Sequence, residues 1–179
     1  MSQPQAPQPA KLVIGFFLKE KDLESELADA LIALYGATDV VSPWFDFNFT
    51  AYYAREMGEP LFRRMFSFKK LIAQQDLAQI KLQTNQLERS FENSGRRRVN
   101  IDPGYLLKER FVLATGKNFS HRIYLDKGIY ADLTLIYQKG DFLSLPWTYP
   151  DYAHKQIQNY LKQVRERYGD DLKQEKQHD

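Results

Sequence analysis

The stretch KLVIGFFL, residues 11–18, decides the fold because it is a nearly unbroken apolar run with β-branched members. A run of this kind predicts a strand that is buried on both faces of a sheet. The segment that follows, DLESELADALIALYG (22–36), predicts a helix with Asp22 as its N-cap and Gly36 as its stop. The chain therefore opens with a strand and then a helix.

The next three segments are shorter and less regular. Residues 39–49 alternate loosely and contain Pro43, which favours an edge strand or a bulge over a central strand. Residues 50–58 predict a short helical turn that ends at a glycine. Residues 61–72 alternate in a way that favours a strand, with a helix as the alternative.

A second long helix is predicted over residues 76–91, where Asp76 and Gln79 form a capping box. A strand is predicted over 96–106, stopping at the turn signal Asp-Pro-Gly at 102–104. The order up to this point is β-α-β-β-α-β, which is the ferredoxin-like arrangement.

The rest of the chain predicts a strand at 111–115, two hairpins in series at 120–145 and a closing helix at 150–169. The predicted fold class is therefore α+β, with a ferredoxin-like βαββαβ core extended by antiparallel hairpins and a C-terminal helix. We expect a disordered tail over residues 1–10, a single domain over residues 11–169 and a polar tail over residues 170–179.

Composition narrows the classes of function. The chain has no cysteine, which excludes disulfides, thiolate nucleophiles and Cys-ligated zinc. No run reaches the roughly 20 apolar residues that a membrane span needs, and the first ten residues do not resemble a signal peptide. We therefore expect a cytoplasmic protein. The net charge of +2 leans weakly toward anionic partners.

The stretch SHRIYLDKGIYADL, residues 120–133, collects many polar side chains around one turn. A three-residue loop with Gly128 in the left-handed conformation gives the register that best separates polar from apolar residues. It predicts four cross-strand pairs: Leu125 with Ile129, Tyr124 with Tyr130, Ile123 with Ala131, and Arg122 with Asp132. This register turns His121 and Ile123 toward the core face. It turns four side chains to the other face: Arg122, Tyr124, Tyr130 and Asp132.

Two interpretations of this polar face stay open. Arg122 and Asp132 form a cross-strand ion pair worth about 0.2–1 kcal/mol, or the four side chains line a groove in which Arg122 holds a phosphate or carboxylate. Asn100 and Asp102 share one face at the carboxyl end of the strand predicted over 96–106. They belong either to an ordinary turn or to the same site as the polar face of the hairpin.

Two further sets of polar residues can each be interpreted either as part of a binding site or as ordinary solvated surface. Lys81, Asn85 and Glu88 follow the edge of the second helix's apolar stripe, and either border a cleft or form a solvated flank. A set of basic residues is either a phosphate-contacting patch for RNA or a soluble face: Arg63, Arg64, Lys69, Lys70, Arg96, Arg97 and Arg98.

Motifs for cofactors are weak. The segment ATGKNF lacks the first glycine and the final Ser or Thr of a P-loop, and no motif identifies a cofactor. No metal site is predicted, because one could be built only if the fold brought together residues that are distant in sequence: Glu56, Asp102, His121 and Asp132.

Several segments together resemble a known family: FTAYYAREMG, IKLQTNQLE, RRVNIDPGYL, SHRIYLDKGIYADLTLIY and PWTYPDY. They are similar to the bacterial and archaeal family described as domain of unknown function 4416, over nearly all of residues 11–168. Some members carry the label GTP-binding protein. The resemblance supplies no catalytic residues.

We therefore expect a protein that binds a small anionic ligand, such as a nucleotide or a phosphometabolite. The expected ligand-binding residues are Arg122, Tyr124, Tyr130, Asp132, Asn100, Lys81 and Asn85. The alternative is a hydrolase or phosphoesterase-like enzyme in which Asp102 and His121 do acid–base work. A third possibility is an RNA- or protein-interaction module.

Overall fold

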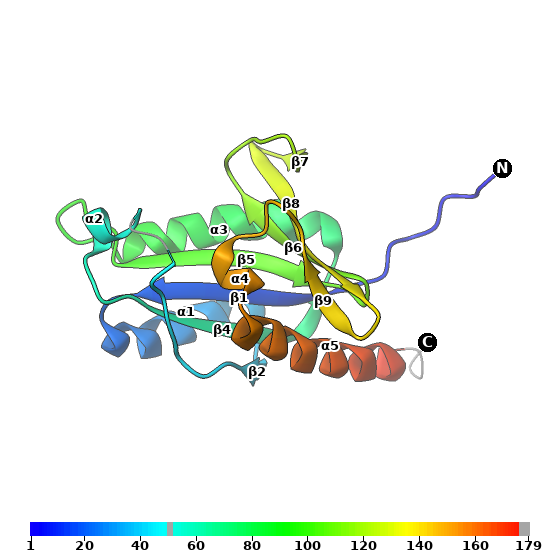
Figure 1. Ribbon diagram of the computed structural model, residues 1–179, viewed down its shortest axis with the longest axis horizontal. Helices are drawn as coiled ribbons and strands as arrows, with labels where there is room; N and C mark the ends of the chain where they lie inside the picture. Colours follow the sequence, from blue (N-terminus) through cyan, green and yellow to red (C-terminus); the bar gives the residue numbers. More distant parts are fainter. Residues whose placement is uncertain (50–51, 176–179) are drawn as a thin grey trace.

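The computed structural model describes residues 1–49 and 52–175. Within them it is an α+β structure with one large antiparallel sheet and helices on both faces (Figure 1). The strands of this sheet are β1 (Ala10–Leu18), β2 (Thr38–Val41), β3 (Phe45–Asp46), β4 (Phe62–Ile72), β5 (Val99–Leu106), β6 (Arg110–Thr115), β7 (Arg122–Asp126), β8 (Ile129–Gln138) and β9 (Asp141–Ser144). The helices are α1 (Glu24–Tyr35), α2 (Ala54–Met57), α3 (Leu77–Ser90), α4 (Pro150–Ala153) and α5 (Lys155–Glu175).

The strands lie in the order β2-β4-β1-β5-β6-β8-β7, with β3 beside β4 and β9 beside β8. Every residue of β1 is buried, as the apolar run at 11–18 predicted. The ambiguous segment at 61–72 is a strand, β4, and the segment containing Pro43 lies at the β2 and β3 edge of the sheet. Residues 50–51 of the predicted helical turn lie outside the described residues, and α2 follows them.

The two faces of β1 pack against different helices. Alternate residues Leu12, Ile14, Phe16 and Leu18 form a core with Leu27 and Leu31 of α1 and Ile80 of α3. On the opposite face, Val13 and Met65 pack in one core with three residues of α5, namely Ile157, Leu161 and Val164. The sheet is therefore the middle layer of three, with α1 and α3 on one side and α4 and α5 on the other (Figure 1).

The helix starts differ from the prediction. Neither Asp22 nor Asp76 caps a helix through its side chain, so the expected N-cap and the Asp76–Gln79 capping box are both wrong. A short 3-10 turn precedes each helix instead, at Lys21–Leu23 and at Gln74–Asp76. The first N–H of each helix donates to a backbone carbonyl of its turn, Glu24 N to Lys21 O and Leu77 N to Gln74 O, which leaves the carboxylates without a capping role.

The predicted turn at Asp102-Pro103-Gly104 is also wrong, because β5 runs through it without a break. Pairing of β5 with β6 extends only from Gly104 to Leu106, so the first half of β5 has an open edge on that side. Residues two apart on a strand point the same way. The Pro103 nitrogen therefore faces the open edge beside Ile101, where no ladder donor is required.

The hairpin register is confirmed where it matters for the polar face. Arg122 lies opposite Asp132 and Tyr124 lies opposite Tyr130. The turn itself differs, because Lys127 and Gly128 both have positive φ, at 51° and 79°. They form a two-residue loop that pairs Asp126 with Ile129, and the register shift between Tyr124 and Asp126 restores the predicted alignment.

The C-terminal helix is longer than predicted and is divided. His154, with an extended ψ of 136°, separates α4 from α5. α5 continues beyond residue 169 to Glu175, with Asp171 and Leu172 buried, so the expected polar tail is helical up to that residue. Residues 176–179 lie outside the described residues. Ala10, expected in the disordered tail, is the buried first residue of β1, and the disorder expected over residues 1–9 stays a prediction.

A buried lysine connects β1 to α5. Lys11 has no exposed surface, and its Nζ donates to Asp171 Oδ2 at 2.6 Å and to the carboxylate of Asp39. Ser67 also donates to Asp39, and Val40 N donates to the same carboxylate at 2.8 Å. Because a buried ammonium without partners is costly, this cluster favours α5 lying over β1 and β4.

We predict that Asp39→Asn lowers the free energy of unfolding at pH 7 by roughly 3 kcal/mol, because it weakens a buried ion pair. Burial raises the pKa of Asp39, but hydrogen bonds from Lys11 and Ser67 outweigh it and hold this pKa below its ordinary value of 3.8. The carboxylate's contribution is therefore complete above about pH 4 and is lost as pH falls through the folded-state pKa. Urea unfolding at several pH values checks this.

The matched control is Asp29→Asn, an exposed carboxylate on α1, which we expect to change stability by less than about 0.5 kcal/mol. Equal urea midpoints for the wild type and Asp39→Asn at pH 7 would contradict the role given to the cluster.

Candidate functional site

A cavity of about 790 Å³ lies where β5 and β6 separate. Its walls come from β5, α3, the end of β6 with the residues after it, α4 with the preceding Tyr149, and the aromatic residues before α2. β1, β4 and β8 each contribute one residue: Phe17, Arg63 and Asp132. The open half of β5 therefore borders a cavity in place of a neighbouring strand.

Two side chains of α3 satisfy the backbone of this open edge. Ile101 N donates to Glu88 Oε1 at 2.6 Å, and Lys81 Nζ donates to Ile101 O at 2.7 Å. Further along β5, a Cβ built on Gly104 would come within 2.5 Å of Val112 O, so only glycine lets β6 approach there. The strands are thus in close contact at Gly104 and apart at Ile101.

Several residues that the sequence pointed to lie on this cavity. Lys81 and Asn85 from α3, Asn100 and Asp102 from β5, and Asp132 from β8 all line it. For each of them the sequence alone is consistent with either a site or an ordinary structural role. The residues lining the cavity in the described part of the chain do not include Arg122, Tyr124, Tyr130 or His121.

Arg122 lies behind the cavity wall. Its Nε donates to Asp132 Oδ2 at 2.9 Å, its Nη1 to Lys117 O at 2.9 Å and its Nη2 to Tyr149 Oη at 2.7 Å. The cross-strand ion pair is therefore formed. Because Lys117 and Tyr149 line the cavity, Arg122 also fixes the positions of two wall residues.

The register predicted that His121 lies on the core face of the hairpin and Asp132 on the other face, and this prediction is wrong. His121 Nε2 lies 3.3 Å from Asp132 Oδ2, and its ring stacks on Trp147 with centroids 4.9 Å apart. His121 precedes the first residue of β7, so strand alternation does not govern it. Ile123, also expected on the core face, is 70% exposed because β7 is the last strand of the sheet.

Arg63, expected on a basic surface, is instead 2% exposed. It forms an ion pair with Asp151, its Nη2 donates to Tyr152 Oη at 2.6 Å, and the same nitrogen lies 3.8 Å from Asp102 Oδ2. Gly15 leaves the space for it, since a Cβ at that position would lie 2.7 Å from Arg63 Nη2. The guanidinium forms part of the cavity wall.

Three other arginines of the expected basic patch also form ion pairs. Arg64 pairs with Glu24, Arg98 with Glu20 at 2.6 Å and Arg97 with Glu56 at 2.6 Å. These ion pairs reduce the positive charge that the interpretation as an RNA surface requires.

Arg97 orients a buried amide. Its Nε and Nη2 bind the two oxygens of Glu56 at 3.2 and 2.6 Å, and its Nη1 donates to Asn100 Oδ1 at 2.8 Å. An arginine donor fixes which end of the Asn100 amide is the oxygen. Asn100 is 4% exposed, and among the described residues its Nδ2 has no hydrogen-bond partner.

Burial raises the pKa of several groups around the cavity. It raises the pKa of Glu88, against the opposing effects of Lys81 and the Ile101 N–H. It also raises the pKa of Tyr53 and of Tyr152, so both phenols are neutral donors near pH 7. Across the described residues, no three His, Asp or Glu side chains are grouped so that they could hold a metal ion.

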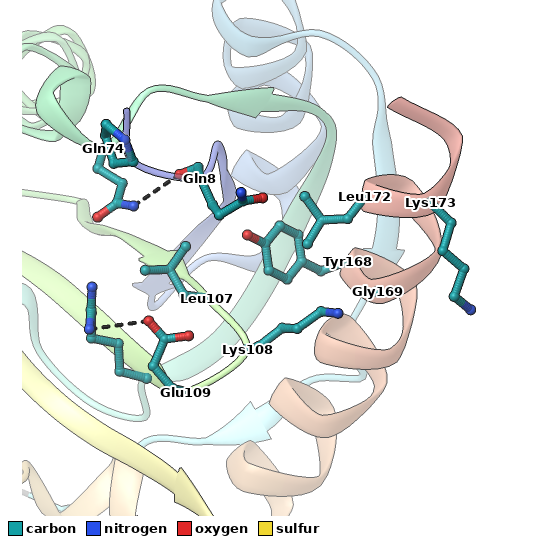
Figure 2. Close-up of a pocket in the computed structure, with 11 residues that line it drawn as sticks. Gln8, Gln74, Leu107, Lys108, Glu109, Tyr168, Gly169, Leu172 and Lys173 are labelled. Carbon is teal, nitrogen blue, oxygen red and sulfur yellow. Dashed lines mark hydrogen bonds and ion pairs between the residues drawn. The ribbon is translucent and has the colours of Figure 1, made fainter. Parts of the chain in front are cut away.

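A second, smaller cavity of about 460 Å³ lies between the N-terminal segment, the β5–β6 turn and the end of α5 (Figure 2). Several of its polar side chains are paired within the protein. Tyr168 Oη donates to Pro9 O at 2.6 Å, and Figure 2 shows Gln74 Nε2 bound to Gln8 O at 2.9 Å and Glu109 paired with Arg110 at 3.1 Å. The larger cavity, which holds the unpartnered Asn100 amide nitrogen, is therefore the stronger candidate site.

The fold and the cavity define an α+β protein whose antiparallel sheet opens around a polar and aromatic cavity. Over residues 8–168 the chain matches the family described as Domain of unknown function (DUF4416), and it belongs to that family. No curated protein and no solved structure matches it. None of the helices in the described ranges is long and apolar enough to cross a membrane.

We predict that Gly15→Ala destabilises the protein by about 2 kcal/mol, because the added methyl group forces Arg63 out of a packed position. Chemical denaturation measures the loss. Gly116→Ala is the matched control, since Gly116 also lines the cavity and nothing lies within 4 Å of a Cβ built there. If both alanines have the same effect, the close approach of Arg63 to Gly15 carries no cost.

Proposed function

We propose that the cavity between β5 and β6 binds a small anionic ligand, such as a nucleotide or a phosphometabolite. One observation carries this proposal: the cavity combines four cationic side chains with an unpartnered buried amide donor. The cationic residues are Arg63, Lys81, Arg97 and Lys117, and the donor is Asn100 Nδ2.

The cavity also contains four carboxylates, but three of them are engaged by protein donors. Asp151 pairs with Arg63, Asp132 accepts from Arg122, and Glu88 accepts from the Ile101 N–H. Asp102 has the looser contact, 3.8 Å from Arg63. The cations nearer solvent are Arg97 and the exposed Lys117. Because Arg63 and Arg97 are themselves paired with carboxylates, the exposed Lys117 is the lining cation most available to a ligand anion.

Aromatic rings complete the walls. Phe49, Tyr53 and Tyr149 line the cavity, and the Lys117 ammonium lies 5.1 Å from the ring centroid of Tyr52. Rings of this kind pack against a base or against the apolar face of a sugar. A ligand with an anionic group and a ring would use both features.

The alternative of a hydrolase or phosphoesterase-like enzyme rests on Asp102 alone in this cavity. His121, its expected partner, lies beyond Asp132 and binds that carboxylate. The observations therefore favour binding over acid–base chemistry by an Asp102–His121 pair.

We further propose that β1, α1, β2, β4, α3 and β5 form a ferredoxin-like core. Its support is the strand order β2-β4-β1-β5 with antiparallel pairing throughout, and the packing of α1 and α3 into one core. The cavity would then lie at the edge of this core, where β6 joins it.

We predict that at least one member of a panel of nucleotides and sugar phosphates raises the melting temperature. A ligand at 100 times its Kd stabilises by about 2.7 kcal/mol, which is roughly 5–10 °C for a chain of this size. Lys117→Gln should weaken binding of that ligand about fivefold, because it removes a cation from the cavity. Differential scanning fluorimetry with a ligand titration measures both.

Lys70→Gln is the control. It removes the same charge from β4, at an exposed position that is not among the described residues lining the cavity. A panel in which no compound shifts the melting temperature would sink the proposal, and so would an equal loss of affinity in both variants.

A further inference from the structure

We infer that Asn100 and Asp102 determine which anionic ligand is bound, by recognising hydroxyl groups of a phosphorylated sugar, free or within a nucleotide. This inference rests on the proposed function and adds the chemistry of the ligand. Both residues lie on β5, at the edge that α3 rather than a strand completes.

The two side chains project in the same direction. They are two residues apart on one strand, so their Cα atoms are separated by about 7 Å and their side chains share a face. Asn100 lies opposite Phe17 and Asp102 opposite Gly15, and both line the cavity. A ligand placed over this face meets an amide and a carboxylate together.

Asn100 offers a donor whose direction is set. Arg97 holds the amide oxygen, and Glu56 holds Arg97 through two hydrogen bonds. The amide nitrogen is left buried and unpartnered within the described structure. A buried donor without a partner costs about 1–3 kcal/mol, and a ligand oxygen that accepts from it removes this cost.

Asp102 offers only acceptors. Its side chain is 29% exposed, and its contact with Arg63 Nη2 is 3.8 Å, longer than a hydrogen bond. A carboxylate at this position repels a phosphate oxygen and requires a donor. The anionic group is therefore expected away from Asp102, toward Lys117.

A hydroxyl group satisfies both requirements, since it accepts from an amide and donates to a carboxylate. Neighbouring hydroxyls of a sugar can meet Asn100 and Asp102 at once. A phosphate oxygen can accept from the Asn100 amide, but a fully ionised phosphate has no donor for Asp102. The pair should therefore discriminate between sugar phosphates with and without a hydroxyl.

Calorimetry on the full chain with matched probe pairs tests this. The pairs are ribose 5-phosphate and 2-deoxyribose 5-phosphate, AMP and 2′-deoxy-AMP, and glucose 6-phosphate and 2-deoxyglucose 6-phosphate, with inorganic phosphate alone as reference. In at least one pair the hydroxylated member should bind about tenfold more tightly, the value of one hydrogen bond to a charged group. The pair that responds distinguishes a free sugar phosphate from a nucleotide.

Two variants assign the discrimination to residues. Asp102→Asn should reduce the ratio of affinities within the responding pair at least threefold. Asn100→Ala should weaken the hydroxylated probe about tenfold. Asn159→Ala, at an exposed position on α5, is the matched control and should leave every affinity unchanged. The ratio measured on the unmodified chain remains a test even if a variant does not fold.

The outcomes separate the two proposals. If phosphorylated probes bind, but the members of each pair bind equally, the hydroxyl inference is overturned and the proposed function stands. An unchanged ratio in Asp102→Asn also overturns the inference. If no probe binds, both the inference and the proposed function fail.

Discussion

The buried ion pair between Arg63 and Asp151 connects the core of this protein to its cavity. It joins the middle of the sheet to α4 across 88 positions of sequence, and both side chains are more than 90% buried. Separating them would leave an uncompensated charge in the interior, at a cost of several kcal/mol. α4 is therefore held where Tyr152 and the preceding Tyr149 form one wall of the cavity. The buried contact between Arg63 and Asp151 thus helps to determine the shape of the candidate site.

Hydrophobic periodicity predicted most of the elements. The run at 11–18 gave the strand buried on both faces, and alternation gave β4 and the pairing of Arg122 with Asp132. The wrong predictions occur where a short sequence motif is compatible with two different local structures. Asp-Pro-Gly is typical of a turn, yet it lies within β5 because the neighbouring strand departs there. No pattern within β5 indicates where β6 separates from it.

The candidate site was predicted in part. Lys81, Asn85, Asn100, Asp102 and Asp132 were found because each lies on a polar edge of an otherwise apolar element. The cavity's arginines were missed as members of the site, because arginine is mostly a surface residue and their partners are distant in sequence: Arg63 with Asp151, and Arg97 with Glu56. Gly15 carried a weak signal, since a glycine inside a strand often marks a close approach by another group.

The open edge of β5 has a consequence for association between chains. An unpaired strand edge normally invites another strand to add to it. Here Lys81 and Glu88 already occupy the backbone groups of Ile101, so a foreign strand would have to displace two charged side chains. The protein can thus keep a gap within its sheet, wide enough for a small molecule, while that gap stays closed to extended peptide.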